Sequence, residues 1–158
     1  MGQRLSILRM QIDKIITDRQ ADRCKDFYVH LYSVSMFCTL LALRRGVDPE
    51  LAATCGMLHD IYQVTDGIIE NHAILGAETA KQMLENIGLY SDEEIEIITT
   101  SISTHGKKRK IHDDAYGELL KDADVLSHCL YDTDYPIIEK EVLRFNKLLA
   151  EIGCKPEE

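Results

Sequence analysis

The sequence predicts an all-α protein that folds as one bundle of about six or seven helices. The chain has 158 residues, which is close to the size of one domain and enough to bury a hydrophobic core. It has only three prolines and nine glycines, so few residues interrupt its helices. Apolar residues recur every three or four positions, as they do in amphipathic helices. No internal repeat divides the chain, so we expect a single domain over residues 1–158.

The first two helices are predicted from apolar spacing. In residues 4–19 the apolar residues fall on one face: Leu5, Leu8, Ile12 and Ile15. Residues 27–43 form the longest stretch without Asp, Glu, Lys or Arg. That stretch is shorter than the roughly 20 apolar residues of a membrane span, and it contains polar residues. We therefore expect a buried core helix that ends near Gly46, and no membrane partner.

Capping signals predict the next two helices. Asp48 before Pro49 is typical of an N-cap followed by proline at the first helical position, and this helix should run to about Ile61. Asn71 is the predicted cap of the following helix, which should end at Gly88.

Three more helices complete the bundle. Ser91-Asp92-Glu93-Glu94 predicts a capping box and a helix that runs to His105. Asp113 or Asp114 is expected to start a helix that runs to Leu130. The sequence Asp134-Tyr135-Pro136 is expected to begin the last helix, which ends at Gly153.

Composition restricts the partners and the compartment. With 18 Lys+Arg against 27 Asp+Glu the formal charge is −9, which argues against polymeric nucleic acid, because phosphate contacts need a basic surface. The five cysteines include no C-x-x-C pair, which indicates reduced thiols in a cytosolic protein. Charged residues in the first turns are unlike a signal peptide, so we expect a cytoplasmic protein.

Histidines and aspartates stand at inward positions of these helices. His59-Asp60 ends a hydrophobic helix, and such a pair is costly to bury without partners. His30 lies in the uncharged helix, on the same stripe as apolar residues. Taken alone, each has a simpler explanation: a solvent-facing helix end for the pair, and a satisfied core histidine for His30.

The same pattern recurs in the second half of the chain. His72 lies in the first turn of its helix, and His105 continues the apolar stripe of the helix before it. Asp124 falls on the apolar face of its helix, whereas Asp122 should point to solvent. The complete set is His30, His59, Asp60, His72, His105 and Asp124.

Imidazoles and carboxylates without thiolates favour Fe, Mn, Co, Ni or Zn over a structural cysteine-type zinc site, with Mg as a further candidate. Two ions held by such a set can activate a water molecule and polarise a phosphoryl oxygen. The set has the right size for two divalent metal ions.

The order of His30, His59-Asp60 and Asp124 resembles the H…HD…D signature of the HD superfamily of metal-dependent phosphohydrolases. The segments around His72 and His105 are similar to the two extra histidines of the binuclear subgroup, which includes HD-GYP phosphodiesterases and bacterial diadenosine tetraphosphate hydrolases.

The resemblance covers about residues 25–130 and implies an all-α bundle with a central binuclear metal site. We expect the C-terminal helix 136–153 to pack on this core. It implies that one ion binds His30, His59, Asp60 and Asp124. Asp60 would bridge to a second ion, held by His72 and His105.

Three departures leave the substrate open. Gln63 occupies the position where many members of the family have a lysine that contacts phosphate. No Gly-Tyr-Pro element follows, which argues against a cyclic-di-GMP phosphodiesterase. Residues 61–66 also lack the Glu-Asp pair that is expected in (p)ppGpp hydrolases.

A basic run, Lys107-Lys108-Arg109-Lys110, directly follows His105. At the rim of a metal site it would attract a phosphate ester; otherwise it is a solvated loop. The candidate catalytic residues are Asp60, Lys107 and His112, the last two for protonating the leaving group, although a surface role is simpler for His112. His128 is either an orienting group or a packing residue.

The predicted function is that of a phosphomonoesterase or phosphodiesterase that acts on a nucleotide or other small phosphate ester through a metal-activated hydroxide. A second copy of the chain, in a homodimer, is a further candidate partner. The alternative is a non-catalytic metal-binding bundle, either a di-iron oxygen-binding protein or a degenerate HD sensor. The first lacks its expected H-x-x-x-E and H-x-x-x-H pairs, because Gln63 and Gly76 stand four residues after His59 and His72. A degenerate HD sensor would be expected to have lost a ligand, and none of the six is missing.

Overall fold

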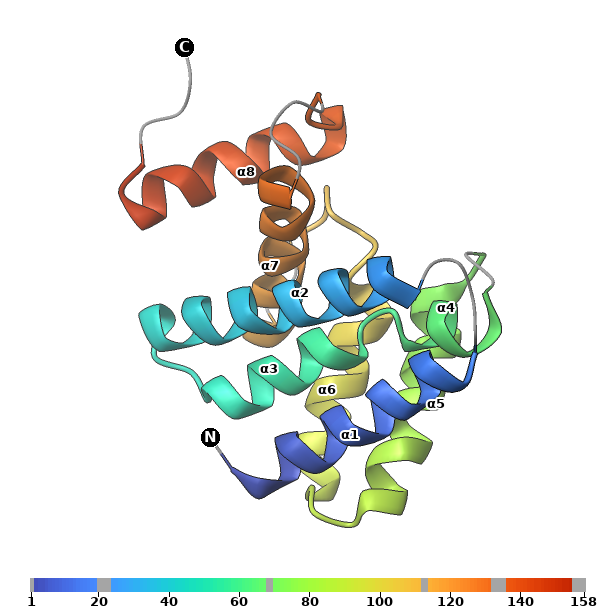
Figure 1. The fold of residues 1–158 in the computed structure, drawn as a ribbon. Coiled ribbons are helices and arrows are strands. Elements are labelled where there is room, and N and C mark those ends of the chain that lie inside the picture. Colours follow the sequence, from blue (N-terminus) through green and yellow to red (C-terminus); the bar gives the residue numbers. More distant parts are fainter. Residues whose placement is uncertain (1, 20–23, 68–69, 112–113, 132–135, 155–158) are drawn as a thin grey trace.

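The computed structural model describes residues 2–19, 24–67, 70–111, 114–131 and 136–154. These ranges contain eight helices and no strand, which confirms the all-α prediction (Figure 1). The helices are α1 (Gln3–Asp18), α2 (Cys24–Arg45), α3 (Pro49–Leu58), α4 (Ile61–Asp66), α5 (His72–Ile87), α6 (Asp92–Thr104), α7 (Ala115–Tyr131) and α8 (Glu139–Ile152).

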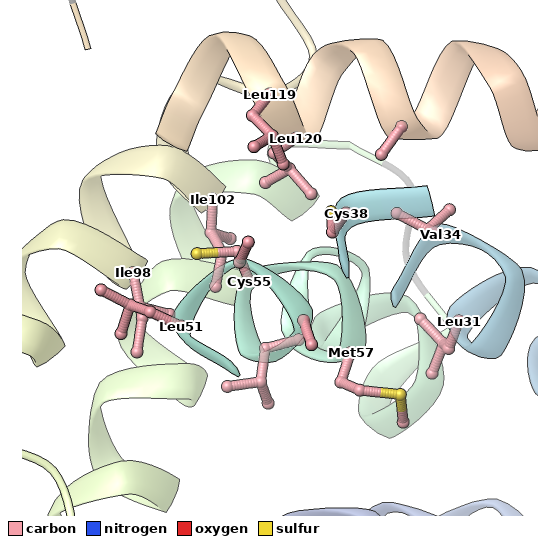
Figure 2. Packing of buried hydrophobic residues seen from close by; sticks show 14 of the residues in the cluster. Leu31, Val34, Cys38, Leu51, Cys55, Met57, Ile98, Ile102, Leu119 and Leu120 are labelled. Carbon is pink, nitrogen blue, oxygen red and sulfur yellow. The ribbon is translucent and has the colours of Figure 1, made fainter. Parts of the chain in front are cut away.

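Helix α3 lies at the centre of the bundle. It packs against α1, α2, α6 and α7, and every residue from Leu51 to Leu58 is buried. Figure 2 shows its side chains between those of the neighbouring helices: Leu51, Cys55 and Met57 of α3, Leu31, Val34 and Cys38 of α2, Ile98 and Ile102 of α6, and Leu119 and Leu120 of α7. Each large apolar side chain buried here contributes about 1.5–3 kcal/mol to folding.

Helices α2 and α3 approach closely at Gly56. A Cβ atom on Gly56 would lie only 2.7 Å from the Cα atom of Ser35, so no larger residue fits without movement of the backbone. The hydroxyl of Ser35 donates a hydrogen bond of 3.0 Å to the carbonyl oxygen of Ala53 across the same interface. This contact fixes α3, and with it the His59-Asp60 pair, against α2.

The predicted caps with local signals are confirmed. The Asp48 carboxylate accepts hydrogen bonds from the backbone N–H groups of Glu50 and Leu51. Ser91 and Glu94 form the capping box, in which each side chain accepts from the backbone N–H of the other residue. These predictions succeed because both partners lie within one helical turn.

Two helix starts differ from the prediction. Asn71 occupies the N-cap position of α5, but its side chain makes no capping hydrogen bond and its backbone is left-handed, with φ of 55°. Helix α8 begins at Glu139 rather than at Pro136, with Ile138 at its N-cap. Asp114 accepts hydrogen bonds from backbone N–H groups in the first turn of α7, whereas Asp113, Asp134 and Tyr135 lie outside the described residues.

The helix predicted to run from Pro49 to Ile61 is interrupted at the His59-Asp60 pair. Asp60 adopts φ of −112° and ψ of 21°, which ends the α-helical path, and the six-residue helix α4 follows. This break adds the short helix that the prediction of six or seven did not include.

Asp122 is buried, contrary to the prediction of a solvated carboxylate, with 7% of its surface exposed. It pairs with Arg45 and Arg144, at 2.6 Å in each case. Two guanidinium groups replace the water that the carboxylate would lose on burial. Arg45 stands 77 residues away in the sequence, so a local pattern could not reveal the pair.

By length and composition alone, residues Lys25–Arg45 would also be able to cross a membrane. In the fold this helix packs against α1, α3 and α7 and supplies buried core residues such as Leu31, Val34 and Leu41. We interpret it as a core helix.

Candidate metal centre

The six predicted ligands lie within helices or directly beside helix ends, and they meet at one end of α3. His30 lies on α2, and His59 and Asp60 lie at the break between α3 and α4. His72 is the first residue of α5, His105 directly follows α6, and Asp124 lies on α7. His59, His105 and Asp124 are buried, and the other three are partly exposed to one cleft.

Four of these residues form a first group of facing ligand atoms. The Nε2 atoms of His30 and His59 lie 3.0 Å apart. They lie 3.6 and 3.5 Å, respectively, from Oδ2 of Asp60. Their distances to Oδ1 of Asp124 are 3.5 and 3.8 Å.

A second group is built on the other oxygen of Asp60. Oδ1 of Asp60 lies 3.4 Å from Nε2 of His72 and 3.4 Å from Nε2 of His105. Those two nitrogens are 3.3 Å apart. The two carboxylate oxygens of Asp60 therefore face two different pairs of histidines.

Backbone carbonyls fix the tautomers of two buried histidines. Nδ1 of His59 lies 2.8 Å from the carbonyl oxygen of Gly56, and Nδ1 of His105 lies 2.7 Å from that of Ile102. Because a carbonyl oxygen only accepts, both Nδ1 atoms carry the proton. In the neutral rings Nε2 then presents a lone pair to the ligand group.

A pair of serines determines the tautomer of His30. The hydroxyl of Ser33 donates to the carbonyl oxygen of His30 at 3.0 Å, which uses its only proton. The hydroxyl of Ser127, 2.6 Å from that of Ser33, must then donate to Ser33. The Ser127 oxygen is left to accept from Nδ1–H of His30 at 3.3 Å, so in the neutral ring Nε2 of His30 again presents a lone pair.

This arrangement fits metal ions. Oδ1 of Asp60 and Oδ1 of Asp124 are buried and have no hydrogen-bond partner among the described residues, which is costly without a cation. Two ligands about 2.1 Å from a metal ion lie about 3.4 Å apart at a tetrahedral angle. The observed separations between ligand atoms in the first group range from 3.0 to 3.8 Å. Nitrogen and carboxylate donors suit divalent transition-metal ions.

The protonation states also favour cations. Burial lowers the pKa of His59 to about 4, so the imidazole is neutral at pH 7 and able to bind a metal ion. Burial alone would raise the pKa of Asp124, but the Lys108 ammonium group and the neighbouring histidines together outweigh burial, and the pKa is lowered. Asp124 is therefore an anion in the folded protein.

Within the basic run, only the side chain of Lys108 enters the cluster. It is 6% exposed and forms an ion pair with Oδ2 of Asp124. Lys107, Arg109 and Lys110 are exposed, and Arg109 lies 3.7 Å from Glu139. His112 lies outside the described residues.

The backbone of the run is held in place by two cationic side chains. Arg144 of α8 donates to the carbonyl oxygen of Lys108 at 3.1 Å. Lys121 of α7, which is fully buried, donates to that of Lys110 at 3.0 Å. These bonds anchor the segment that carries Lys108 beside Asp124.

The two groups of candidate ligands open into a cleft of about 390 Å³. Five of the six candidate ligands line it, and the sixth, His59, lies behind them. Gln63 and Lys108 also line the cleft, together with Lys140 of α8. A small anionic substrate can therefore reach the ligand atoms from solvent.

Sequence reasoning left the role of His128 open and did not find its partner. Nε2 of His128 lies 3.3 Å from Oδ1 of Asp124, and Nδ1 lies 3.3 Å from Oε1 of buried Glu141. The hydrogen bond to Glu141 outweighs burial and raises the pKa of His128. The spacing of His128 one turn after Asp124 was the available signal, but nothing local indicates Glu141 of α8.

The chain matches the family model of the HD domain over residues 27–129. It is 31% identical over 120 residues to Ribonuclease Y of Lawsonia intracellularis, which covers 75% of this chain and 21% of that protein. It is 40% identical over 77 residues to Ribonuclease Y of Clostridium tetani, covering 44% of this chain and 15% of that protein. The chain thus spans about a fifth or less of the length of these relatives.

A crystal structure of a predicted HD superfamily hydrolase from an uncultured Thermotogales bacterium shares the fold. The TM-score is 0.61 at 20% sequence identity, and the match covers 90% of this chain and 88% of that chain. The residues matched by the family model include all six candidate ligands. The chain belongs to the HD domain family.

Proposed function

We propose that this HD domain is a phosphohydrolase that cleaves a phosphate ester with two divalent metal ions. The observation that supports this most directly is the position of Asp60. One of its oxygens faces His30 and His59, and the other faces His72 and His105. A carboxylate placed in this way is suited to bridge two cations, a common arrangement for phosphoryl chemistry.

When bound, the two cations would lower the pKa of a water molecule and polarise the phosphoryl oxygens. The chain supplies the surrounding charge. Lys108 lines the cleft beside Asp124, where its ammonium group would contact a phosphoryl oxygen and offset the charge that develops in the transition state. Lys108 would thus supply the positive charge that a lysine supplies at position 63 in many members of the family, where this chain has Gln63.

Protonation of the leaving group stays a prediction for Lys107 or His112. Lys107 is exposed on the segment that carries Lys108, and His112 lies outside the described residues. A cytoplasmic location and a homodimer also stay predictions.

RNA is a second candidate substrate, although the sequence argued against polymeric nucleic acid. It is supported by relatives named Ribonuclease Y and by a groove of about 630 Å³ that shares Lys108 and Lys140 with the cleft. The groove is lined by six cations: Arg45, Lys108, Arg109, Lys140, Arg144 and Lys147.

Acidic residues offset much of this charge, however, because Arg45 and Arg144 both pair with Asp122. Since the whole chain also carries a charge of −9, a small phosphate ester is the first candidate.

The test combines metal analysis with a substrate panel. Metal-stripped protein is reloaded with Mn²⁺, Co²⁺, Ni²⁺ or Mg²⁺ and assayed on mononucleotides, phosphodiesters and single-stranded RNA. Asp60→Ala is expected to lower kcat about 10³-fold or more, because the loss of bridged cations removes several kcal/mol of transition-state stabilisation. Asp66→Ala, which removes an exposed carboxylate of α4, is the matched control and should retain activity.

Circular dichroism of both variants tests whether they remain helical. Full activity of Asp60→Ala would contradict the proposal. Metal binding with a reversible spectral change on exposure to oxygen, and no hydrolysis of any ester, would favour the non-catalytic alternative. Cleavage of RNA that falls steeply with salt and is weakened by Lys147→Glu would favour the second candidate.

A further inference from the structure

A second cavity adjoins the metal cleft on the side of α7 and α8. It has a volume of about 320 Å³, at the small end of the range for ligand pockets. Most of its lining is apolar: Val29 of α2, Cys129 and Tyr131 of α7, and Pro136, Ile137 and Ile138 before α8. None of these residues belongs to the candidate metal ligands.

The cavity shares lining residues with the metal cleft. His30 and His128 line both spaces, and their rings stack with centroids 5.2 Å apart and an interplanar angle of 7°. Asp26 and Glu141 also line both. A ligand anchored at the metal ligands therefore has an apolar space within reach at the same rim.

We propose that this pocket receives the aromatic ring of the substrate, and that the ring is a nucleobase that carries an exocyclic amino group. The inference rests on the proposed function for the position of the phosphate. In a nucleotide, one sugar separates the phosphate from the base, which suits two cavities with a shared rim. The volume provides room for one flat ring system, and an apolar lining favours a ring over a second phosphate.

The carboxylates that line both cavities indicate which kind of ring the pocket would bind. The carboxylates of Asp26 and of Glu141, whose Oε1 is already paired with His128, are hydrogen-bond acceptors and repel a further anion. A base that offers N–H donors is thus favoured over an aryl group without them. An amino-bearing base combines a flat apolar face with two such donors on one nitrogen atom.

The first experiment measures binding without catalysis. Adenosine is titrated into the metal-loaded full chain, with the methyl groups of Val29, Ile137 and Ile138 observed by NMR. These methyl signals are expected to shift. Purine riboside, which lacks only the amino group, should bind about tenfold more weakly, as the loss of a hydrogen bond to a charged acceptor requires. Absence of methyl shifts with adenosine would overturn the proposal, and equal affinity of the two nucleosides would overturn the choice of an amino-bearing base.

Two variants fill the pocket from different sides. Ile138→Trp and Val29→Trp should each weaken adenosine binding at least about tenfold, since a tryptophan takes the space of the base. Leu43→Trp, at an exposed position on the same helix as Val29, is the matched control and should leave binding unchanged. Equal affinity of Ile138→Trp and Leu43→Trp for adenosine would contradict the proposal.

Hydrolysis provides the second readout. In Ile138→Trp, kcat/KM for adenosine 5′-monophosphate should fall at least about tenfold relative to glycerol phosphate, which has no ring to place in the pocket. An unchanged ratio would count against the pocket. If adenosine binds as expected but no phosphate ester is hydrolysed, the proposed function fails and the binding pocket stands.

Discussion

The hydrogen bonds from Ser33 through Ser127 to His30 determine which nitrogen of His30 faces the metal position. Ser127→Ala removes the acceptor for Nδ1–H, so the ring is free to rotate or to carry its proton on Nε2. We expect Mn²⁺ to bind about 10- to 100-fold more weakly, the usual effect of removing a group that orients a metal ligand. Titration calorimetry of the metal-stripped protein measures this change.

A control separates the orienting role of Ser127 from a general loss of packing. Ser101 is also a buried helical serine, but its hydroxyl donates to the Ile97 carbonyl oxygen, outside the metal groups. Ser101→Ala should keep the affinity for Mn²⁺. Nitrogen-15 shifts of His30 in the metal-free protein should change from the Nδ1–H tautomer to a mixture only in Ser127→Ala; an unchanged tautomer and affinity would assign Ser127 to packing alone.

At the scale of helices, the contact between α2 and α3 determines the distance between His30 and His59. In Gly56→Ala the new Cβ would lie 2.7 Å from Cα and 2.8 Å from N of Ser35, both backbone atoms, so the helices must separate. We expect a loss of about 1–3 kcal/mol in the free energy of unfolding, as for other overpacked interiors. Urea denaturation of the metal-free protein measures it.

The same change should weaken metal binding, because the carbonyl oxygen of Gly56 accepts the Nδ1–H of His59 and moves with α3. Gly106→Ala is the control for stability: a Cβ there meets no atom within 4 Å, and the free energy of unfolding should change by less than about 0.5 kcal/mol. Equal stability of the two variants would show that α2 and α3 have room to adjust.

The sequence predicts the helices better than it predicts their ends. The Asp48 cap and the capping box of Ser91 involve residues within one turn, so a local pattern contains both partners. The break at Asp60 has no such signal, because the apolar spacing continues into Ile61, which is buried. The start of α8 at Glu139 was missed for a similar reason, since Pro136 is equally suited to the segment before a helix.

At the scale of the whole molecule, the sequence predicts which residues point inward but not which of them meet across the fold. The six candidate ligands were identifiable because each is a polar residue at a helix end or on the apolar face of its helix. The contacts of Asp124 with Lys108 and of His128 with Glu141 depend on how α7 lies against the 107–110 run and α8. Helix spacing contains no information on that arrangement.

Metal ions should also stabilise the entire fold, since the ligands come from three helices and from the ends of others. The unfolded chain does not hold these ligands together, so cations bind mainly to the folded state. At a Mn²⁺ concentration 100 times Kd the gain is about 2.7 kcal/mol, and at about 2–4 °C per kcal/mol Tm should rise by about 5–11 °C.

Differential scanning calorimetry with Mn²⁺ and then with excess chelator measures this shift and its reversal. Asp60→Asn should lose most of the metal-dependent increase, because it weakens one oxygen of each group, whereas exposed Asp66→Asn should keep it. The Tm of metal-free Asp60→Asn, measured in excess chelator, reports separately on any role of Asp60 in the fold. A lower metal-free Tm together with an intact Mn²⁺ response would mean that Asp60 supports the fold rather than the metal ions.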